Sequence, residues 1–272
     1  MNTQSIGLRY FLMLLTALVI NGCGDGVNEK QPVPEAPAII TEPELPAHDL
    51  TSLLAGESRA ETDRVRDAGR KPADVIAFLG IEPGMNVIDV IAAAGYYTEV
   101  LSLAVGPEGH VAAQNPAFVL EIRDGVNEKA LSARLADERL GNVSRLDKEV
   151  DEISPDDGPF DAAITALNFH DIYYNRGEEG AVKMMRVIYA AMKPGGVFGI
   201  IDHHGAEGND NKALHRALKK DAIRTAEAAG FVLEGESGLL HMHGDDMTQS
   251  VFTEGLRGKT HRFLLKLRKP EG

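Results

Sequence analysis

The sequence predicts an α/β fold, a doubly wound and mostly parallel sheet of seven strands with an antiparallel edge strand. Short apolar segments alternate with helical segments of about ten residues, which is typical of a parallel sheet covered by helices on both faces. The last two apolar segments have no helical segment between them. They are therefore expected to pair as a hairpin-like edge of the sheet.

The elements follow from these patterns in chain order. Pro72 opens a short helix that Gly80 ends, the positions that proline and glycine favour at helix ends. Four more helices are expected at Tyr97–Val105, Asn127–Leu140, Glu179–Met192 and Lys212–Ala229. The strands are expected at Asn86–Val90, His110–Gln114, Val143–Leu146, Phe160–Leu167, Val197–Ile201, Phe231–Glu236 and Arg262–Arg268. The fourth strand is nearly all apolar, as a strand buried on both faces should be.

Residues 1–22 have the form of a signal peptide, because Arg9 precedes an apolar run that ends at Ile20. The run is shorter than the ~20 residues that a membrane-spanning helix needs. Cys23, the only cysteine in the chain, follows directly and resembles the acylated cysteine of bacterial lipoproteins. The alternative is an ordinary signal peptide with an incidental cysteine.

Residues 23–50 carry five prolines among acidic residues and no apolar period, which predicts a lipid-anchored flexible linker. The folded domain is then residues 51–272. This organisation predicts an exported lipoprotein of a bacterial membrane that faces the periplasm.

The chain is acidic, with 41 Asp and Glu against 28 Lys and Arg and a formal net charge of −13. It has no surplus of cations to neutralise phosphates, so no nucleic-acid partner is expected.

Several segments look like one family. Val87-Ile-Asp-Val90 with Gly95-Tyr-Tyr-Thr98 resembles the first motif of class I S-adenosylmethionine-dependent methyltransferases. Their fourth, fifth, sixth and closing strands resemble Phe160–Ile164, Met192–Asp202, Gly230–Leu233 and Phe263–Pro270. A group of exported predicted bacterial methyltransferases is similar at Arg64–Asp67, Lys71-Pro72, Gly95–Tyr97, Asp202-His203 and Arg257–Thr260. The resemblance implies a Rossmann-like methyltransferase fold, methyltransferase activity and S-adenosylmethionine as the cofactor.

The resemblance also implies a cofactor site across the carboxyl ends of the first, second and fourth strands. The residues expected to bind the cofactor there are Asp89, Ala92, Ala93, Gly95, Tyr96 and Asn115. This chain departs from the family at three of the positions considered. Ile91 and Ala93 stand where the family has glycines, and Gln114-Asn115 stands where it has an acid that holds the ribose. Tyr96 and Tyr97 either stack on the ligand or pack the start of a helix.

The expected catalytic residues are His170, Asn168 and Asp202. Asn168 and His170 follow the fourth strand, which borders the acceptor in this fold, and His170 is the expected base for the acceptor's proton. The alternative is that His170 and Asp171 only cap the next segment. Arg257–Thr260 either holds an anion or forms a solvated turn.

Histidines cluster late in the chain. His203 and His204 follow Asp202, and His241 and His243 alternate, so on a strand their rings would share a face. No spacing here is diagnostic of a metal, and no metal site is assigned.

The sequence therefore predicts a membrane-tethered S-adenosylmethionine-dependent methyltransferase with a small-molecule or macromolecular acceptor. The alternative is a non-catalytic binding or scaffold protein on the same fold with a degraded cofactor site. A dinucleotide-dependent oxidoreductase is disfavoured, because the three-glycine fingerprint and the acidic ribose contact are missing.

Overall fold

The computed structural model describes residues 49–272. The predicted signal peptide, Cys23 and nearly all of the predicted linker lie outside the described residues. Within the described part, no helix is both long enough and apolar enough to cross a membrane.

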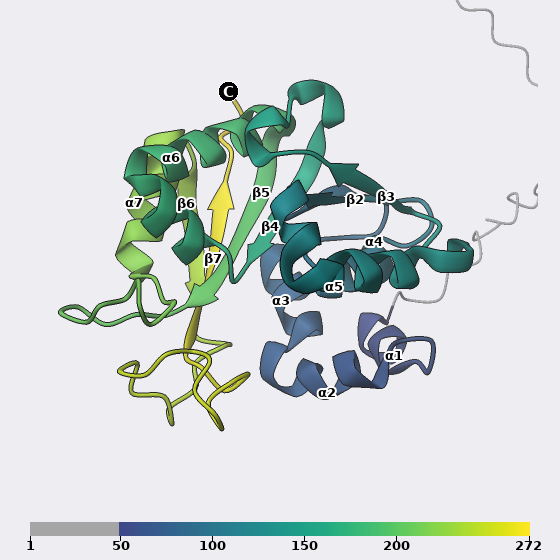
Figure 1. Ribbon diagram of the computed structural model, residues 1–272. Coiled ribbons are helices and arrows are strands. Elements are labelled where there is room, and N and C mark those ends of the chain that lie inside the picture. The colour runs from purple at the N-terminus through teal and green to yellow at the C-terminus, as the bar shows by residue number, and fades with distance from the viewer. Residues whose placement is uncertain (1–48) are drawn as a thin grey trace, which may run out of the picture. The chain divides into compact units, whose positions relative to one another are not determined.

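The strands form one seven-stranded sheet in the order β3-β2-β1-β4-β5-β7-β6 (Figure 1). They are β1 (Asn86–Val90), β2 (His110–Asn115), β3 (Val143–Asp147), β4 (Phe160–Ala166), β5 (Met192–His203), β6 (Val232–Ser237) and β7 (Arg262–Arg268). The first five pair in parallel, and β7 pairs antiparallel with both β5 and β6. The predicted antiparallel edge is confirmed, with β7 lying between β5 and the outermost strand β6.

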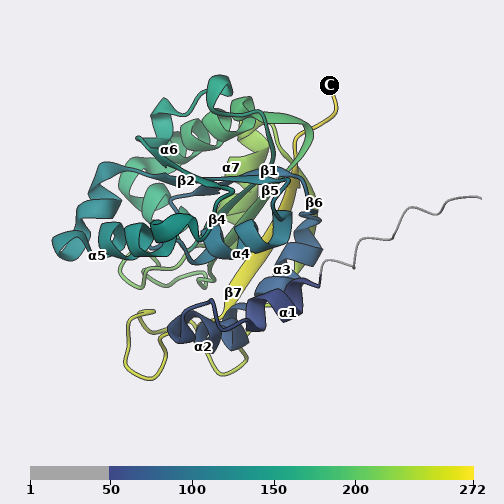
Figure 2. The same ribbon diagram turned by 90° about the vertical axis from the view of Figure 1, so that its right-hand side faces the viewer.

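The helices are α1 (Leu50–Ala55), α2 (Glu61–Arg70), α3 (Pro72–Leu79), α4 (Tyr96–Val105), α5 (Ala117–Leu135), α6 (Phe169–Ala191) and α7 (Lys219–Ala229). Buried side chains of α6 and α7 pack on one face of the sheet, and those of α1, α3 and α4 pack on the other (Figure 2). The doubly wound, mostly parallel arrangement predicted from the sequence is thus confirmed.

The ends of α3 show how local sequence sets an element. Pro72 occupies the first turn, where its missing N–H costs nothing, and Gly80 ends the helix at φ +73°. β1 keeps the predicted bounds, and its last four residues are buried, as both faces of the sheet are covered.

α5 spans Ala117–Leu135 instead of the predicted Asn127–Leu140, and residues 122–125 between its two helical stretches have non-helical backbone. Two more helices differ from their predicted bounds. α6 begins at Phe169 instead of Glu179, because Gly177 at φ +73° joins two helical stretches into one element. α7 begins at Lys219 instead of Lys212, because residues 212–218 form a turn in which Ala217 bridges to His204. Both differences fall beside the carboxyl edge of the sheet.

The long connection between β6 and β7, residues 238–261, lies beside α2 in both views (Figures 1 and 2). The Arg262 guanidinium ties the two together by donating to the Gly69 carbonyl at 2.7 Å. These two segments cover the carboxyl ends of β4 and β5.

Candidate functional site

The loop after β1 keeps a glycine-like backbone although it has only one of the expected glycines. Ile91, Ala93 and Gly95 have φ of +57°, +51° and +80°. The left-handed region is open to glycine but strained for other residues, and most for a β-branched one. The side chain of Ile91 is buried in the apolar core on the α6 face of the sheet.

The carboxyl end of β2 binds this loop directly. The Ile91 N–H donates to Gln114 Oε1 at 2.9 Å, and the Ala93 N–H donates to Asn115 Oδ1 at 2.8 Å. Asn115 Nδ2 in turn donates to the Ala93 carbonyl at 3.3 Å. Asn115, the residue expected to hold a ribose, is fully buried and uses both ends of its amide on the loop.

Gly95 is surrounded by the chain's own side chains. A Cβ at this position would lie 2.8 Å from Leu131 Cδ1 and 3.1 Å from Arg134 Cδ, both of α5. Arg134 Nε also donates to the Ala94 carbonyl at 3.1 Å. The need for glycine here is therefore set by α5 as well as by the positive φ.

Asp89 lies under the loop and is buried. Its carboxylate accepts from Thr98 Oγ1 at 2.7 Å, and burial raises its pKa to about 6 against this hydrogen bond. Ala92, also predicted to bind the cofactor, donates its N–H to the Gln114 carbonyl at 2.9 Å.

Tyr96 packs at the start of α4, as the packing alternative for this residue predicts. It is 4% exposed, and its hydroxyl donates to Asp67 Oδ1 at 2.6 Å. The guanidinium groups of Arg66 and Arg70 lie 4.7 and 4.3 Å from its ring centroid.

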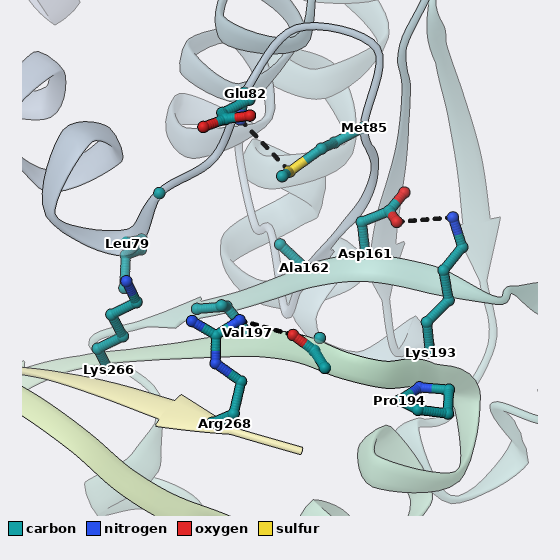
Figure 3. A pocket seen from close by; sticks show the side chains of 13 residues that line it. Leu79, Glu82, Met85, Asp161, Ala162, Lys193, Pro194, Val197, Lys266 and Arg268 are labelled. Atoms are coloured by element: carbon teal, nitrogen blue, oxygen red, sulfur yellow. Dashed lines mark hydrogen bonds and ion pairs between the residues drawn. The ribbon is translucent and has the colours of Figure 1, made fainter. Parts of the chain in front are cut away.

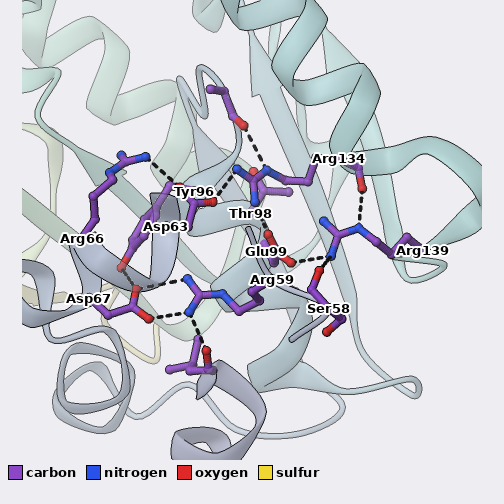
Figure 4. A network of polar contacts seen from close by, with 12 residues as sticks. Ser58, Arg59, Asp63, Arg66, Asp67, Tyr96, Thr98, Glu99, Arg134 and Arg139 are labelled. Carbon is purple, nitrogen blue, oxygen red and sulfur yellow. Dashed lines mark hydrogen bonds and ion pairs between the residues drawn. The ribbon is translucent and has the colours of Figure 1, made fainter. Parts of the chain in front are cut away.

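A network of charged groups fastens α2 and α5 to α4 beside this loop (Figure 4). Arg134 pairs with Asp63 at 2.7 Å and with Glu99, and Arg139 pairs with Glu99 at 2.5 Å. Arg59, which is buried, pairs with Asp67 at 2.5 Å. The carboxylates of Asp63 and Glu99 are almost fully buried, so their charges depend on these partners.

The predicted catalytic residues come together at the carboxyl ends of β4 and β5. Asp202 is fully buried and accepts three hydrogen bonds, from the His170 ring Nδ1 at 2.8 Å and from the N–H groups of His170 and His203, both at 2.7 Å. Asn168 Nδ2 donates to the Ile91 carbonyl at 3.2 Å, which links this cluster to the loop after β1.

The histidines of this cluster differ in their electrostatics. Burial lowers the pKa of His170, but the charge and hydrogen bond of Asp202 outweigh it and raise the pKa above its usual value. Burial lowers the pKa of His203 to about 3, so this ring is neutral near neutral pH. His203 Nδ1 lies 2.7 Å from Thr260 Oγ1.

A cavity of about 900 Å³ lies against His170 and His203, between α2 and the segment 251–262. We call it the cationic cavity, because five basic side chains and one acidic one, Asp171, line it. The basic residues are Arg66, Arg70, Arg257, Lys259 and Arg262. Arg257, Lys259 and Thr260 belong to a segment with two interpretations from the sequence, an anion site or a solvated turn.

Arg66 pairs with Asp63, and the other four basic residues have no acidic partner within the described part of the chain. Within the described residues Arg70 and Arg262 form no ion pair, and Arg262 is 3% exposed and donates to backbone carbonyls. Burial lowers the pKa of both guanidinium groups, which stay charged. A buried cation without a counter-charge, such as Arg262, attracts an anionic ligand.

A second cavity of about 350 Å³ lies at the opposite, amino edge of the sheet (Figure 3). There Lys193 pairs with Asp161 at 2.6 Å, and Arg268 donates to the Gly195 carbonyl at 2.6 Å. Ligands of open α/β sheets bind at the carboxyl ends of the strands, so this cavity is not the candidate site.

His241 and His243 do not lie on a strand, the arrangement considered from the sequence. The His241 ring stacks on His261 with centroids 4.3 Å apart. Stacked rings do not direct their nitrogens at a common point.

Sequence reasoning missed Arg70 and Arg262 as members of the site. Arg70 and Arg262 are 192 residues apart and meet only through the contact of α2 with the segment before β7. The one available signal was the pair of motifs Arg64–Asp67 and Arg257–Thr260, which flank them in the sequence.

Comparisons with known proteins agree with this architecture. No protein-family model matches the chain. The ubiquinone/menaquinone biosynthesis C-methyltransferase UbiE of Idiomarina loihiensis is 28% identical over 119 residues, which are 43% of this chain and 42% of UbiE. The match thus spans less than half the length of this curated relative.

Solved structures share the fold. A SAM-dependent methyltransferase from Aquifex aeolicus is 20% identical and aligns over 73% of this chain and 89% of its own, with a TM-score of 0.51. The 4+2 cyclase SpnF is 18% identical and aligns over 83% of this chain and 94% of its own, with a TM-score of 0.56. The sheet order and these likenesses show that the chain has the fold of class I S-adenosylmethionine-dependent methyltransferases.

Proposed function

We propose that the protein is an S-adenosylmethionine-dependent methyltransferase whose acceptor binds in the cationic cavity. The observation that carries the proposal is the His170–Asp202 pair in the wall of this cavity, at the carboxyl ends of β4 and β5. The switch point of a doubly wound sheet lies at this edge, where the fold binds its ligands.

His170 is suited to accept a proton. Asp202 fixes the ring through Nδ1, which leaves Nε2 as the free base, 3.5 Å from Asp171 Oδ2. Bound S-adenosylmethionine would supply an electrophilic methyl group on sulfur. The acceptor's oxygen or nitrogen would form the new bond to the methyl carbon as the carbon–sulfur bond breaks and its electron pair stays on the sulfur of S-adenosylhomocysteine. His170 Nε2 would take the acceptor's proton. Much of the rate would come from alignment of the two reactants, which is worth ~7–11 kcal/mol in favourable cases.

The cations of the cavity indicate the class of acceptor. Arg262 and Lys259 line it from the segment before β7. We therefore propose an acceptor that carries a carboxylate, phosphate or similar anionic group.

The cofactor fits this chain through a limited set of residues. Ala92, Ala93 and Gly95 are small and keep the glycine-like turn, and Arg70 lies over the Tyr96 and Tyr97 rings with no acidic partner among the described residues. Arg70 would hold the carboxylate of the methionine moiety, and the loop would face the sulfonium side.

One observation supports the alternative of a non-catalytic scaffold protein. Gln114 and Asn115 already occupy the N–H groups of Ile91 and Ala93, which leaves those donors unavailable to a ligand. A protein of this kind would keep the fold and lose useful cofactor affinity.

Calorimetric titration of the full chain with S-adenosylmethionine and S-adenosylhomocysteine distinguishes an enzyme from a scaffold protein. An enzyme is expected to bind both, and Arg70→Met is expected to weaken binding by ~10-fold or more through loss of a charge-assisted contact. Lys71→Met, the neighbouring cation outside the cavity, is the matched control. Absence of binding at millimolar ligand would favour the scaffold.

We also propose that the protein is a bacterial lipoprotein acylated at Cys23 and exported to the periplasmic face of a membrane. The support is the sequence pattern of residues 1–23 and the proline-rich segment that follows it.

A further inference from the structure

A second chemical feature lies beside the cationic cavity and shares only His170 with the proposed methyl transfer. Asp171 of α6 lies between two imidazoles. Its Oδ2 is 3.5 Å from His170 Nε2, and its Oδ1 is 3.5 Å from His215 Nδ1. The two rings are 5.5 Å apart and nearly perpendicular. All three ligand atoms of the group lie within 4.8 Å of one another.

The two 3.5 Å separations are close to those of neighbouring ligands around one metal ion. Two ligands at ~2.1 Å from a tetrahedral metal are ~3.4 Å from each other. Two imidazoles and one carboxylate form a common three-residue set for a metal that keeps a position open. We propose that His170, Asp171 and His215 bind a divalent transition metal of the zinc class.

The surroundings of His170 support the proposal independently of these distances. Its Nδ1 donates to Asp202, a fully buried carboxylate that also accepts two backbone N–H groups. Metal-binding histidines typically donate their second ring nitrogen to a carboxylate in this way, which fixes the ring and the tautomer. Nε2 is left as the coordinating atom.

The third residue is held in place by its own contacts. His215 lies in the turn before α7, with its ring packed edge-on against Phe252 at 4.8 Å. His170, Asp171 and Phe252 all line the cationic cavity, so the open metal position would face an anionic ligand there.

The metal site goes beyond the proposed methyl transfer and does not rest on it. A metal ion and the acceptor's proton would compete for the same atom, His170 Nε2. The metal-bound and metal-free states therefore assign different roles to His170, and binding is tested without cofactor or acceptor.

The test is calorimetric titration of the full chain with zinc chloride, with no polyhistidine tag and with Cys23→Ser to remove the thiol. We expect one zinc ion per chain, and a visible absorption band when cobalt chloride is used instead. Asp171→Asn and His215→Ala change half-exposed side chains and should leave the unfolding temperature nearly unchanged. Each should weaken zinc binding by more than ~10–100-fold, the usual loss from a supporting residue alone.

Two further variants sharpen the result. Asp202→Asn is expected to weaken zinc binding by ~10–100-fold as a positioning residue. His243→Ala, an exposed histidine away from the group, should bind as the parent chain does. The proposal is overturned if the parent chain takes up no zinc, or if Asp171→Asn and His215→Ala bind it as tightly as the parent. Absence of S-adenosylmethionine binding would leave all these outcomes unchanged and would bear on the proposed function only.

Discussion

Ile91 shows how one residue can hold a strained backbone at low net cost. A non-glycine residue in the left-handed region costs ~1–2 kcal/mol. Burial of an isoleucine side chain is worth ~1.5–3 kcal/mol, and Ile91 is 8% exposed in the core. The cost of the backbone strain and the gain from burial are comparable, so position 91 adopts a left-handed conformation without being glycine. Ala93 has no such compensation beyond the hydrogen bonds to Asn115.

Asp89 should make stability depend on pH. Its pKa is about 6 in the folded protein against 3.8 for an ordinary aspartate, so it favours folding below pH 4 and loses that contribution as pH rises through 6. Asp89→Asn removes the effect. The variant's free energy of unfolding should therefore rise relative to the parent between pH 4 and 6, by at most ~3 kcal/mol at ~1.4 kcal/mol per pKa unit. Urea unfolding at several pH values measures this.

Asp157→Asn is the control of opposite sign. Burial would raise the pKa of Asp157, but hydrogen bonds from Lys148 and Ser154 lower it below its usual value. The stabilising contribution of Asp157 is present at neutral pH and lost on acidification. The free energy of unfolding of Asp157→Asn should therefore fall relative to that of the parent as pH rises. If the free energies of unfolding of the two variants, each relative to the parent, change with pH in the same direction, Asp89 is not a buried carboxyl of raised pKa.

At the scale of elements, the carboxyl edge of the sheet depends on how α2, α4 and α5 are joined. Arg134 of α5 reaches Asp63 of α2, Glu99 of α4 and the Ala94 carbonyl of the loop after β1. One side chain thus fixes three helices relative to the candidate cofactor loop. Arg145 offers a comparison, because it also pairs with two carboxylates but at the surface.

Arg134→Met should destabilise the protein far more than Arg145→Met. Loss of Arg134 leaves buried carboxylates short of a partner, which costs ~3–5 kcal/mol, whereas a surface ion pair contributes ~0–1 kcal/mol. Urea unfolding at constant pH gives both values. Equal losses would mean that the buried network does not hold the helices together.

At the scale of the whole molecule, charge is distributed unevenly. The chain has a formal net charge of −13, yet the candidate site gathers five basic side chains around one cavity. The local cations, not the net charge, decide what binds there. Salt screens the electrostatic effect of the remaining acidic surface beyond about 8–10 Å. An anionic ligand is thus compatible with an acidic protein.

The tether is also a property of the whole protein. Mass spectrometry of the protein extracted from bacterial membranes should find an N-terminus at Cys23 that carries acyl chains. Cys23→Ala should leave the protein out of the membrane fraction, because the lipid is the proposed anchor. An unmodified Cys23, or residues 1–22 still attached, would defeat the lipoprotein proposal.

The sequence by itself determined the fold class, because the alternation of apolar and helical segments sets which backbone groups pair and which faces are buried. It also located β1, α3 and the Asp202 strand end, where local turn residues and apolar runs act within a few positions. Only the tertiary structure decided what the site contains. Asn115 binds the loop after β1, Arg70 and Arg262 line one cavity, and His215 lies 3.5 Å from Asp171. Such contacts join residues far apart in the chain, so they leave no periodic pattern in the sequence.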